Sequence, residues 1–301
     1  MPAPTETHNL RGIALMVAAM AGFGIEDVFL KRATAVLPTG EVMLVTDVVI
    51  FAFFAALTRA QGRPLVERTI AQPVVLARLA GEALAAIGYL TALSMVPLPM
   101  VSAVLQAVPL AVTFGAALVM GEAVGWRRWS AVGSGFLGVL IIIRPGFAGF
   151  VPPVLWVVLT VAAIALRDLA SRRLPRQIST AQVATWSVGA GGLAGAGLMA
   201  GQGWVTPSAG EWLTLAGATV SGGAGYFAIT AATRIGEASA IAPYRYLRLI
   251  FVLVLAMAFL GEAPDALTLL GAALIVGSGL YALARERLKR RSALSTATNP
   301  G

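Results

Sequence analysis

The tripeptide Gly121-Glu122-Ala123 recurs as Gly261-Glu262-Ala263, 140 residues further along a chain of 301 residues. Each copy follows the end of a long apolar segment, so the two halves of the chain share a feature at equivalent positions. A motif repeated at nearly half the chain length indicates internal duplication. If each half crosses a membrane an odd number of times, the second half lies upside down relative to the first, as in secondary transporters.

The composition indicates a membrane protein with many crossings. Hydrophobic residues make up 58% of the chain, charged residues 12%, and the mean hydropathy is +0.82. A soluble domain carries about 25% charged residues. The net charge of +8 comes from basic residues scattered between apolar runs and from a basic tail, so we expect no nucleic-acid partner.

Several kinds of chemistry are excluded by residues that the chain lacks. It has no cysteine, and its one histidine, His8, lies in the polar N-terminal segment. Disulfides, thiolate metal sites, histidine triads and multi-histidine metal sites are therefore ruled out. We expect neither a cofactor nor a metal.

Ten apolar runs have roughly the 20 residues that a helix needs to cross about 30 Å of hydrocarbon. They predict an all-α protein with ten transmembrane helices at 11–31, 41–58, 74–95, 100–120, 129–144, 152–171, 180–200, 211–232, 238–260 and 266–284. With the N-terminus inside, seventeen of the 22 Lys and Arg residues fall on the inner side and three on the outer side. Because positive loops are retained in the cytoplasm, both termini are predicted to be cytoplasmic.

The two halves match at a second place. The segment at 26–32, which holds two acidic residues and closes with Lys31 and Arg32, aligns with 167–173, which closes with Arg172 and Arg173. Five helices per half then predict two inverted repeats, at 11–146 and 152–284, followed by a basic cytoplasmic tail at 285–301.

Two stretches resemble a known family. The sequence GEAVGWRRWSAVGSGFLGVLIIIRPG at 121–146, and PYRYLRL at 243–249 with GEAPD at 261–265, are similar to EamA domains of the drug/metabolite transporter superfamily. The resemblance covers about residues 11–284. It implies two inverted EamA repeats, a central substrate cavity, and in bacteria the export of small metabolites across the cytoplasmic (inner) membrane. The family commonly carries an arginine in the middle of its second helix, where this chain has Asp47.

Charged residues inside apolar segments are the first candidates for a binding site. Each costs at least about 2.5 kcal/mol at the centre of the bilayer, so it should face a cavity or a charged partner. Arg248 lies ten residues into its segment, close to the midplane. Arg245 and Tyr244 precede it by three and four residues and should share its face, beside a helix interrupted at Pro243. This face would suit a carboxylate or another anion, although Arg248 could instead be held by an acidic partner.

Four acidic residues are candidates for proton coupling or for charge partners, because carriers use intramembrane carboxylates as proton relays. They are Glu26, Asp27, Asp47 and Glu82. The alternative for the first two is an interfacial salt bridge with the basic pair one turn later. Four further polar or aromatic residues are expected to line the substrate path: Tyr89, Gln106, Trp186 and Tyr226. Glu122 and Glu262 are each expected to cap the helix that follows.

These observations predict a secondary transporter, an exporter or exchanger, that moves small organic metabolites by alternating access. The partners expected are a small-molecule substrate and the lipid bilayer. Because no P-loop is present, transport would use the substrate gradient, protons or exchange. Amino acids, other carboxylates, vitamins and hydrophobic cations all fit as substrates, with anions favoured by the arginines. The alternative is a membrane-embedded enzyme acting on lipid-linked substrates.

Overall fold

The computed structural model describes residues 6–121, 125–147, 149–175, 177–235 and 237–298. These residues form twelve α-helices and three 3₁₀ segments, and no strand occurs among them. The prediction of an all-α protein is therefore confirmed.

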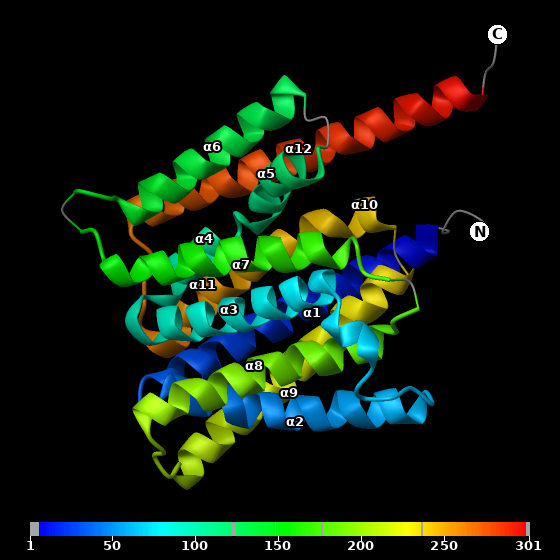
Figure 1. Cartoon of the computed structure of the whole chain (residues 1–301). Coiled ribbons are helices and arrows are strands. Elements are labelled where there is room, and N and C mark those ends of the chain that lie inside the picture. The colour runs from blue at the N-terminus through cyan, green and yellow to red at the C-terminus, as the bar shows by residue number, and fades with distance from the viewer. Residues whose placement is uncertain (1–5, 122–124, 148, 176, 236, 299–301) are drawn as a thin grey trace.

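The first half runs from α1 to α6, and the second from η2 to α12 (Figure 1). The first half comprises α1 (Glu6–Thr34), α2 (Thr39–Ala60), η1 (Arg68–Ala71), α3 (Pro73–Met95), α4 (Leu98–Leu105), α5 (Val108–Met120) and α6 (Trp126–Ile143). The second comprises η2 (Pro152–Val154), α7 (Leu155–Ser171), α8 (Thr180–Gln202), α9 (Ala209–Ile235), α10 (Ala238–Ile241), η3 (Ala242–Tyr246), α11 (Leu247–Leu260) and α12 (Ala266–Thr298).

The helices lie side by side along one direction and alternate in sense (Figure 1). The start of α1 and the end of α12 lie at the same end of the bundle, called here the terminal end. The most extensive packing joins the halves: α1 with α9, α2 with α8, α3 with α7, and α6 with α12. α1 and α7 are the first long helices of the two halves, and α3 and α9 are the third. Exchanging equivalent helices therefore turns the α1–α9 pair into the α7–α3 pair. This pairing is what two halves related by a two-fold axis would produce.

The glycines of the repeated tripeptide end equivalent helices. Gly121 closes α5 with φ 67° and Gly261 closes α11 with φ 68°, and their N–H groups bond the carbonyls of Ala116 and Ala256. Both glycines adopt the left-handed conformation, which glycine reaches without steric cost. The two helix ends are therefore built in the same way, 140 residues apart.

The predicted capping role is wrong for Glu262. The cap of α12 is Asp265, whose Oδ1 accepts the Thr268 N–H at 2.8 Å. Glu262 instead accepts the Leu98 N–H at the start of α4. Inter-half packing places the N-terminus of α4 beside the α11–α12 connection, and the carboxylate satisfies a free N–H group of that helix end instead. Glu122 lies outside the described residues.

Two predicted helices, 100–120 and 238–260, are broken. The first divides at Gln106 and Ala107 into α4 and α5, just before Pro109, which cannot donate to the helical ladder. The second passes from α10 through the 3₁₀ turn η3 into α11, at the position of Pro243. The sequence predicted the interruption at Pro243 but not the one at Gln106.

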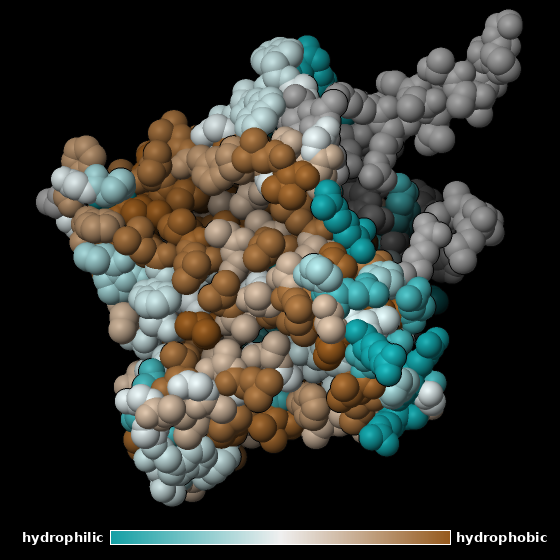
Figure 2. Space-filling view, in the orientation of Figure 1, coloured by the Kyte–Doolittle hydropathy of each residue, from teal (hydrophilic) through white to brown (hydrophobic). Residues whose placement is uncertain are grey.

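Eight described spans, counting α4–α5, η2–α7 and η3–α11 as single units, are long and apolar enough to cross a membrane. The chain is therefore a multi-pass membrane protein. Two of the ten predicted spans fall short: α6 carries Arg127 and Arg128 in its first turn, and α9 is rich in glycine, serine and threonine. Figure 2 shows apolar surface over most of the visible face, with hydrophilic side chains gathered at the terminal end.

Candidate functional site

Arg248, in the first turn of α11, binds Asp27 of α1. Its Nε donates to Asp27 Oδ2 at 3.0 Å and its Nη2 donates to Oδ1 at 2.6 Å. Asp27 is only 1% exposed, while the Arg248 side chain is 28% exposed. The two halves of the chain thus meet in a bidentate ion pair, the geometry in which arginine recognises carboxylates.

Two aromatic residues complete this group. The Tyr89 hydroxyl, from α3, donates to Asp27 Oδ1, and Arg248 Nη2 lies 3.5 Å from the same hydroxyl. The guanidinium carbon lies 5.4 Å from the centre of the Phe23 ring, within the range of a cation–π interaction. We call Phe23, Asp27, Tyr89 and Arg248 the Arg248 cluster. It joins α1, α3 and α11.

The basic pair after Asp27 has other partners. Lys31 Nζ donates to the carbonyls of Leu93 and Val96 at 2.7 and 2.8 Å, and lies 3.6 Å from Glu262. Arg32 donates to the Phe259 carbonyl at 2.8 Å. The alternative of an interfacial salt bridge from this pair to Asp27 is therefore wrong, because both basic side chains bind helix C-termini. Glu26 lies against Gly222 of α9.

A second polar group surrounds Glu82. Its carboxylate lies 3.7 Å from Arg78 Nη1 and 3.2 Å from Arg167 Nη1 of α7. Arg167 Nε also donates to Asp168 at 2.9 Å. Arg78 donates to the hydroxyls of Ser171 and Ser187, which adds α8 to the group. We call Arg78, Glu82, Arg167 and Asp168 the Glu82 cluster. Sequence reasoning counted both arginines as loop charges, although the i,i+4 spacing of Arg78 and Glu82 was a usable signal.

Arg245 and Tyr244 do not join the Arg248 cluster, contrary to the predicted shared face. Arg245 is exposed, and among the described residues it makes no ion pair with Asp27 or with the other partners of Arg248. Tyr244 packs against the apolar side chains around Met16 and Ile241. The prediction assumed α-helical spacing, which the 3₁₀ turn at Ala242–Tyr246 interrupts.

The other predicted site residues are dispersed. The Gln106 amide donates to the Tyr246 carbonyl at 3.2 Å and so ties together the two broken helices. Asp47 lies against Gly191 and Gly192 of α8. The remaining two contact apolar or loop groups: Tyr226 packs edge-on against Phe54, and the buried Trp186 donates to the Leu65 carbonyl at 2.6 Å.

Comparisons with known proteins point to one family. The sequence profile of the EamA-like transporter family matches residues 10–144 and 151–283. A solved crystal structure superimposes with a TM-score of 0.56 at 20% identity, over 90% of this chain and 98% of the other, a likeness that concerns the fold alone.

Three curated relatives are named as carriers of small molecules. The S-adenosylmethionine uptake transporter of Rickettsia prowazekii (strain Madrid E) is 28% identical over 65% of this chain and 66% of its own length. The riboflavin transporter of Rhizobium johnstonii is 30% identical over 72% of this chain and 70% of its length. The pseudopaline exporter of Pseudomonas aeruginosa (strain UCBPP-PA14) is 27% identical over 88% of this chain and 93% of its length. The chain thus spans about two thirds of the first of these relatives.

Proposed function

Because this chain belongs to the EamA-like transporter family, we propose that it is a secondary transporter that exports or exchanges small organic metabolites by alternating access. In this proposal α6 and α9 also cross the bacterial inner membrane, which makes ten crossings in two inverted repeats, 11–146 and 152–284. Both termini and the tail at 285–301 lie in the cytoplasm. The family and its named relatives are transporters, not enzymes.

The bidentate pair of Arg248 with Asp27 carries the proposal. One partner comes from each half, so relative movement of the halves changes the distance between them. A substrate carboxylate has the same geometry as the Asp27 carboxylate and competes with it for the guanidinium. We therefore infer that the substrate bears a carboxylate, which displaces Asp27 from Arg248. The released Asp27 takes up a proton and gives it back when the substrate leaves, which couples transport to protons.

Most of the remaining predicted residues have roles around this exchange. Tyr89 holds the freed Asp27 carboxylate, and the exposed Arg245 offers a second cation for an anionic substrate. Glu26, Asp47 and Glu82 extend the set of carboxylates that relay protons. Gln106 and Tyr226 are assigned to the proposed substrate path, whereas Tyr244 and Trp186 pack in apolar clusters and are left out of it.

Matching contacts at the two ends of the bundle support alternate opening. At the end opposite the termini, Arg32 donates to the Phe259 carbonyl at 2.8 Å. At the terminal end Arg173, which aligns with Arg32, donates to the Val119 carbonyl at 3.4 Å. Arg32 stands in the last turns of α1 and Arg173 in the turn just after α7, so each contact joins the end of the first helix of one half to the last turn of the broken helix of the other. Movement that loosens one contact and tightens the other would expose the site to each side in turn.

Counterflow in proteoliposomes tests the proposal. Vesicles preloaded with a mixture of amino acids and small carboxylates should take up the same labelled compounds, with S-adenosylmethionine and riboflavin tested alongside. Arg248→Ala should abolish uptake, and Arg248→Lys should restore little because lysine cannot form the bidentate pair. Arg63→Ala, in the exposed connection after α2, is the matched control. Full transport by Arg248→Ala at normal membrane levels would overturn the central claim.

A further inference from the structure

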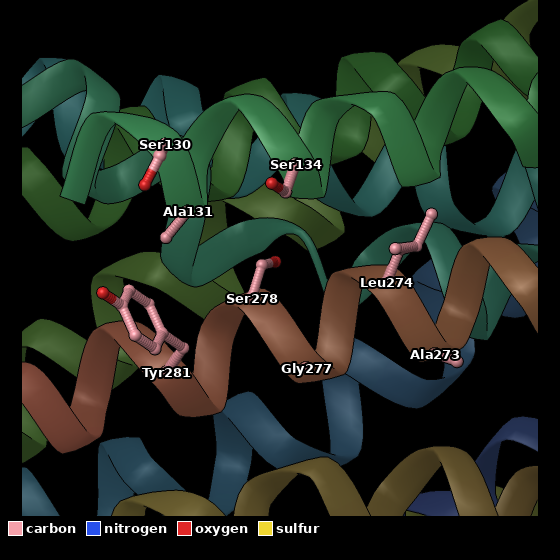
Figure 3. Close-up of a pocket in the computed structure, with 8 residues that line it drawn as sticks. All are labelled: Ser130, Ala131, Ser134, Ala273, Leu274, Gly277, Ser278 and Tyr281. Carbon is pink, nitrogen blue, oxygen red and sulfur yellow. The ribbon is translucent and has the colours of Figure 1, made fainter. Parts of the chain in front are cut away.

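A groove lies between α6 and α12, the last helices of the two halves (Figure 3). It has a volume of about 300 Å³. Its lining comes from both helices: Ser130, Ala131 and Ser134 of α6, and Ala273, Leu274, Gly277, Ser278 and Tyr281 of α12. Ser130, Ser134, Gly277 and Tyr281 are exposed, so the groove opens on the outer surface of the bundle and is separate from the Arg248 and Glu82 clusters.

The two helices touch beyond one end of the groove, at Gly138 and Gly271, while the groove has open space at Gly277. A Cβ added to Gly138 would lie 2.7 Å from the Gly271 carbonyl oxygen, so the two backbones touch there. A Cβ added to Gly277 would meet no atom within 4 Å. The helices thus pack closely at Gly138 and Gly271 and leave open space at Gly277. In a membrane, this open space faces lipid.

Hydroxyl groups make the groove unusual for a lipid-facing surface. Ser130 and Ser278 donate to the carbonyls of Arg127 and Ile275, which leaves their oxygen lone pairs available. Within the part of the chain that the structure describes, the hydroxyls of Ser134 and Tyr281 have no hydrogen-bond partner. Polar groups in hydrocarbon are costly unless they find one.

Positive charge lies at one end of the groove. On α6, Arg127 precedes Ser130 by three residues and Ser134 by seven; on α12, Arg285 follows Tyr281 by four and Ser278 by seven. These spacings place each arginine on the face that lines the groove. α6 begins at the terminal end and α12 ends there (Figure 1). Arg127 stands in the first turn of α6, and Arg285 follows the part of α12 that lines the groove, so both arginines lie toward that end. This is the end predicted to be cytoplasmic, where the leaflet is rich in anionic lipids.

We propose that this groove is a binding site for an anionic phospholipid. An acyl chain lies over Ala273 and Leu274, which line the groove on the side away from the arginines. The phosphate lies between Arg127 and Arg285, and the Tyr281 hydroxyl donates to an ester oxygen of the glycerol. The occupant is a lipid and not a free anion, because the apolar part of the groove extends away from the arginines into the membrane.

Native mass spectrometry of the whole protein in detergent, titrated with phosphatidylglycerol or phosphatidylcholine, tests the proposal. We expect one tightly bound phosphatidylglycerol and much weaker phosphatidylcholine binding. The double variant Arg127→Gln/Arg285→Gln should weaken phosphatidylglycerol binding about thirtyfold. Each basic residue near the membrane surface contributes about 1 kcal/mol to the attraction, and the sum of the two corresponds to that change in the dissociation constant. Arg59→Gln/Arg63→Gln, with the same charge change at exposed positions of the terminal end, should change it little.

A second pair of variants tests the groove itself. Gly277→Leu fills the open space in the groove and should abolish the bound phosphatidylglycerol. Gly133→Leu is the matched control, because Gly133 is exposed on α6, also has open space around an added Cβ, and does not line the groove. Equal binding of the two lipids, full binding by Gly277→Leu, or displacement of the lipid by inorganic phosphate alone would overturn the proposal. Transport activity is not needed for this readout, so its result is independent of the proposed function.

Discussion

Asp27 is almost completely buried and forms an ion pair with Arg248. Replacing it with asparagine leaves the Arg248 guanidinium without a counter-ion inside the bundle. Breaking a buried pair in this way costs about 3 kcal/mol or more, whereas replacing both partners with apolar residues of similar size costs much less. We therefore expect Asp27→Asn to lower stability strongly and Asp27→Leu/Arg248→Met to recover most of the loss. Unfolding in mixed micelles measures both, and similar stabilities for the single and double variants would contradict the expectation.

Asp265 lies outside the membrane-spanning segments and has a lowered pKa. Burial opposes ionisation, but hydrogen bonds from Thr268 and Arg144 outweigh it and lower the pKa of Asp265 from 3.8 to about 2. The resulting stabilisation is present above about pH 4 and is lost as the pH falls toward 2. Because the side chain is half exposed, the effect on stability is small.

The Asp265 pKa itself gives the sharper test. Arg144→Gln should raise the pKa of Asp265 only part of the way toward its ordinary value, since Thr268 still donates to the carboxylate. Carbon-13 NMR of labelled aspartate measures the titration. Thr268→Val should also raise it, and an Asp265 pKa unchanged by both substitutions would show that neither contact controls it.

The identity of charged residues could be read from the sequence, but their partners could not. Arg248 and Asp27 both stood out as charges within apolar segments. Local spacing suggested that Asp27 pairs with Lys31 or Arg32, one turn away. The structure pairs it with a residue 221 positions later, because α1 packs against α11 and α9. Phe23 had no signal of its own, since an aromatic residue in a membrane helix is ordinary.

At the scale of elements, the two broken helices meet at equivalent positions. Gln106 at the α4–α5 break donates to the carbonyl of Tyr246, 140 residues later, at the end of η3. Gln106→Ala removes this bond and leaves a backbone carbonyl without it, at a cost of about 1 kcal/mol. Thermal unfolding should show the loss, while Gln61→Ala, at an exposed helix end, should be neutral. Equal effects of the two substitutions would rule out a specific role for the contact.

Helix bounds were predictable where apolar runs end at glycine, proline or basic residues, and the breaks were predictable only in part. Pro243 signalled one break. The break at Gln106 lies two residues before Val108 and three before Pro109, and a proline near the middle of a membrane helix is often accommodated without one. The partner across the bundle helps to hold this turn, and sequence spacing does not reveal that partner.

At the scale of the whole molecule, Lys31 and Glu262 connect the halves at the end opposite the termini. Lys31 binds the C-terminus of α3, Glu262 binds the N-terminus of α4, and the two side chains lie 3.6 Å apart. The chain has no cysteine, so Lys31→Cys/Glu262→Cys introduces the only thiols. If transport requires this end to open, cross-linking the two cysteines should stop counterflow, and reduction of the cross-link should restore it.

Each single cysteine variant, treated with the same reagent, is the control for this experiment and should keep transporting. Undiminished transport by the fully cross-linked protein would show that the halves do not separate at this end.

By itself the sequence determined that this is an all-helical, multi-pass membrane protein with two related halves of the EamA type. The first properties follow from local hydropathy and from a motif repeated along the chain, and the family type follows from the resemblance of residues 121–146, 243–249 and 261–265 to EamA domains. None of them depends on which helices touch. Only the tertiary structure decided that Asp27, Tyr89 and Arg248 form one cluster, that Glu262 caps α4, and that α6 and α12 enclose a groove. Each of these contacts joins residues far apart in the chain, and helix packing, not sequence spacing, brings them together.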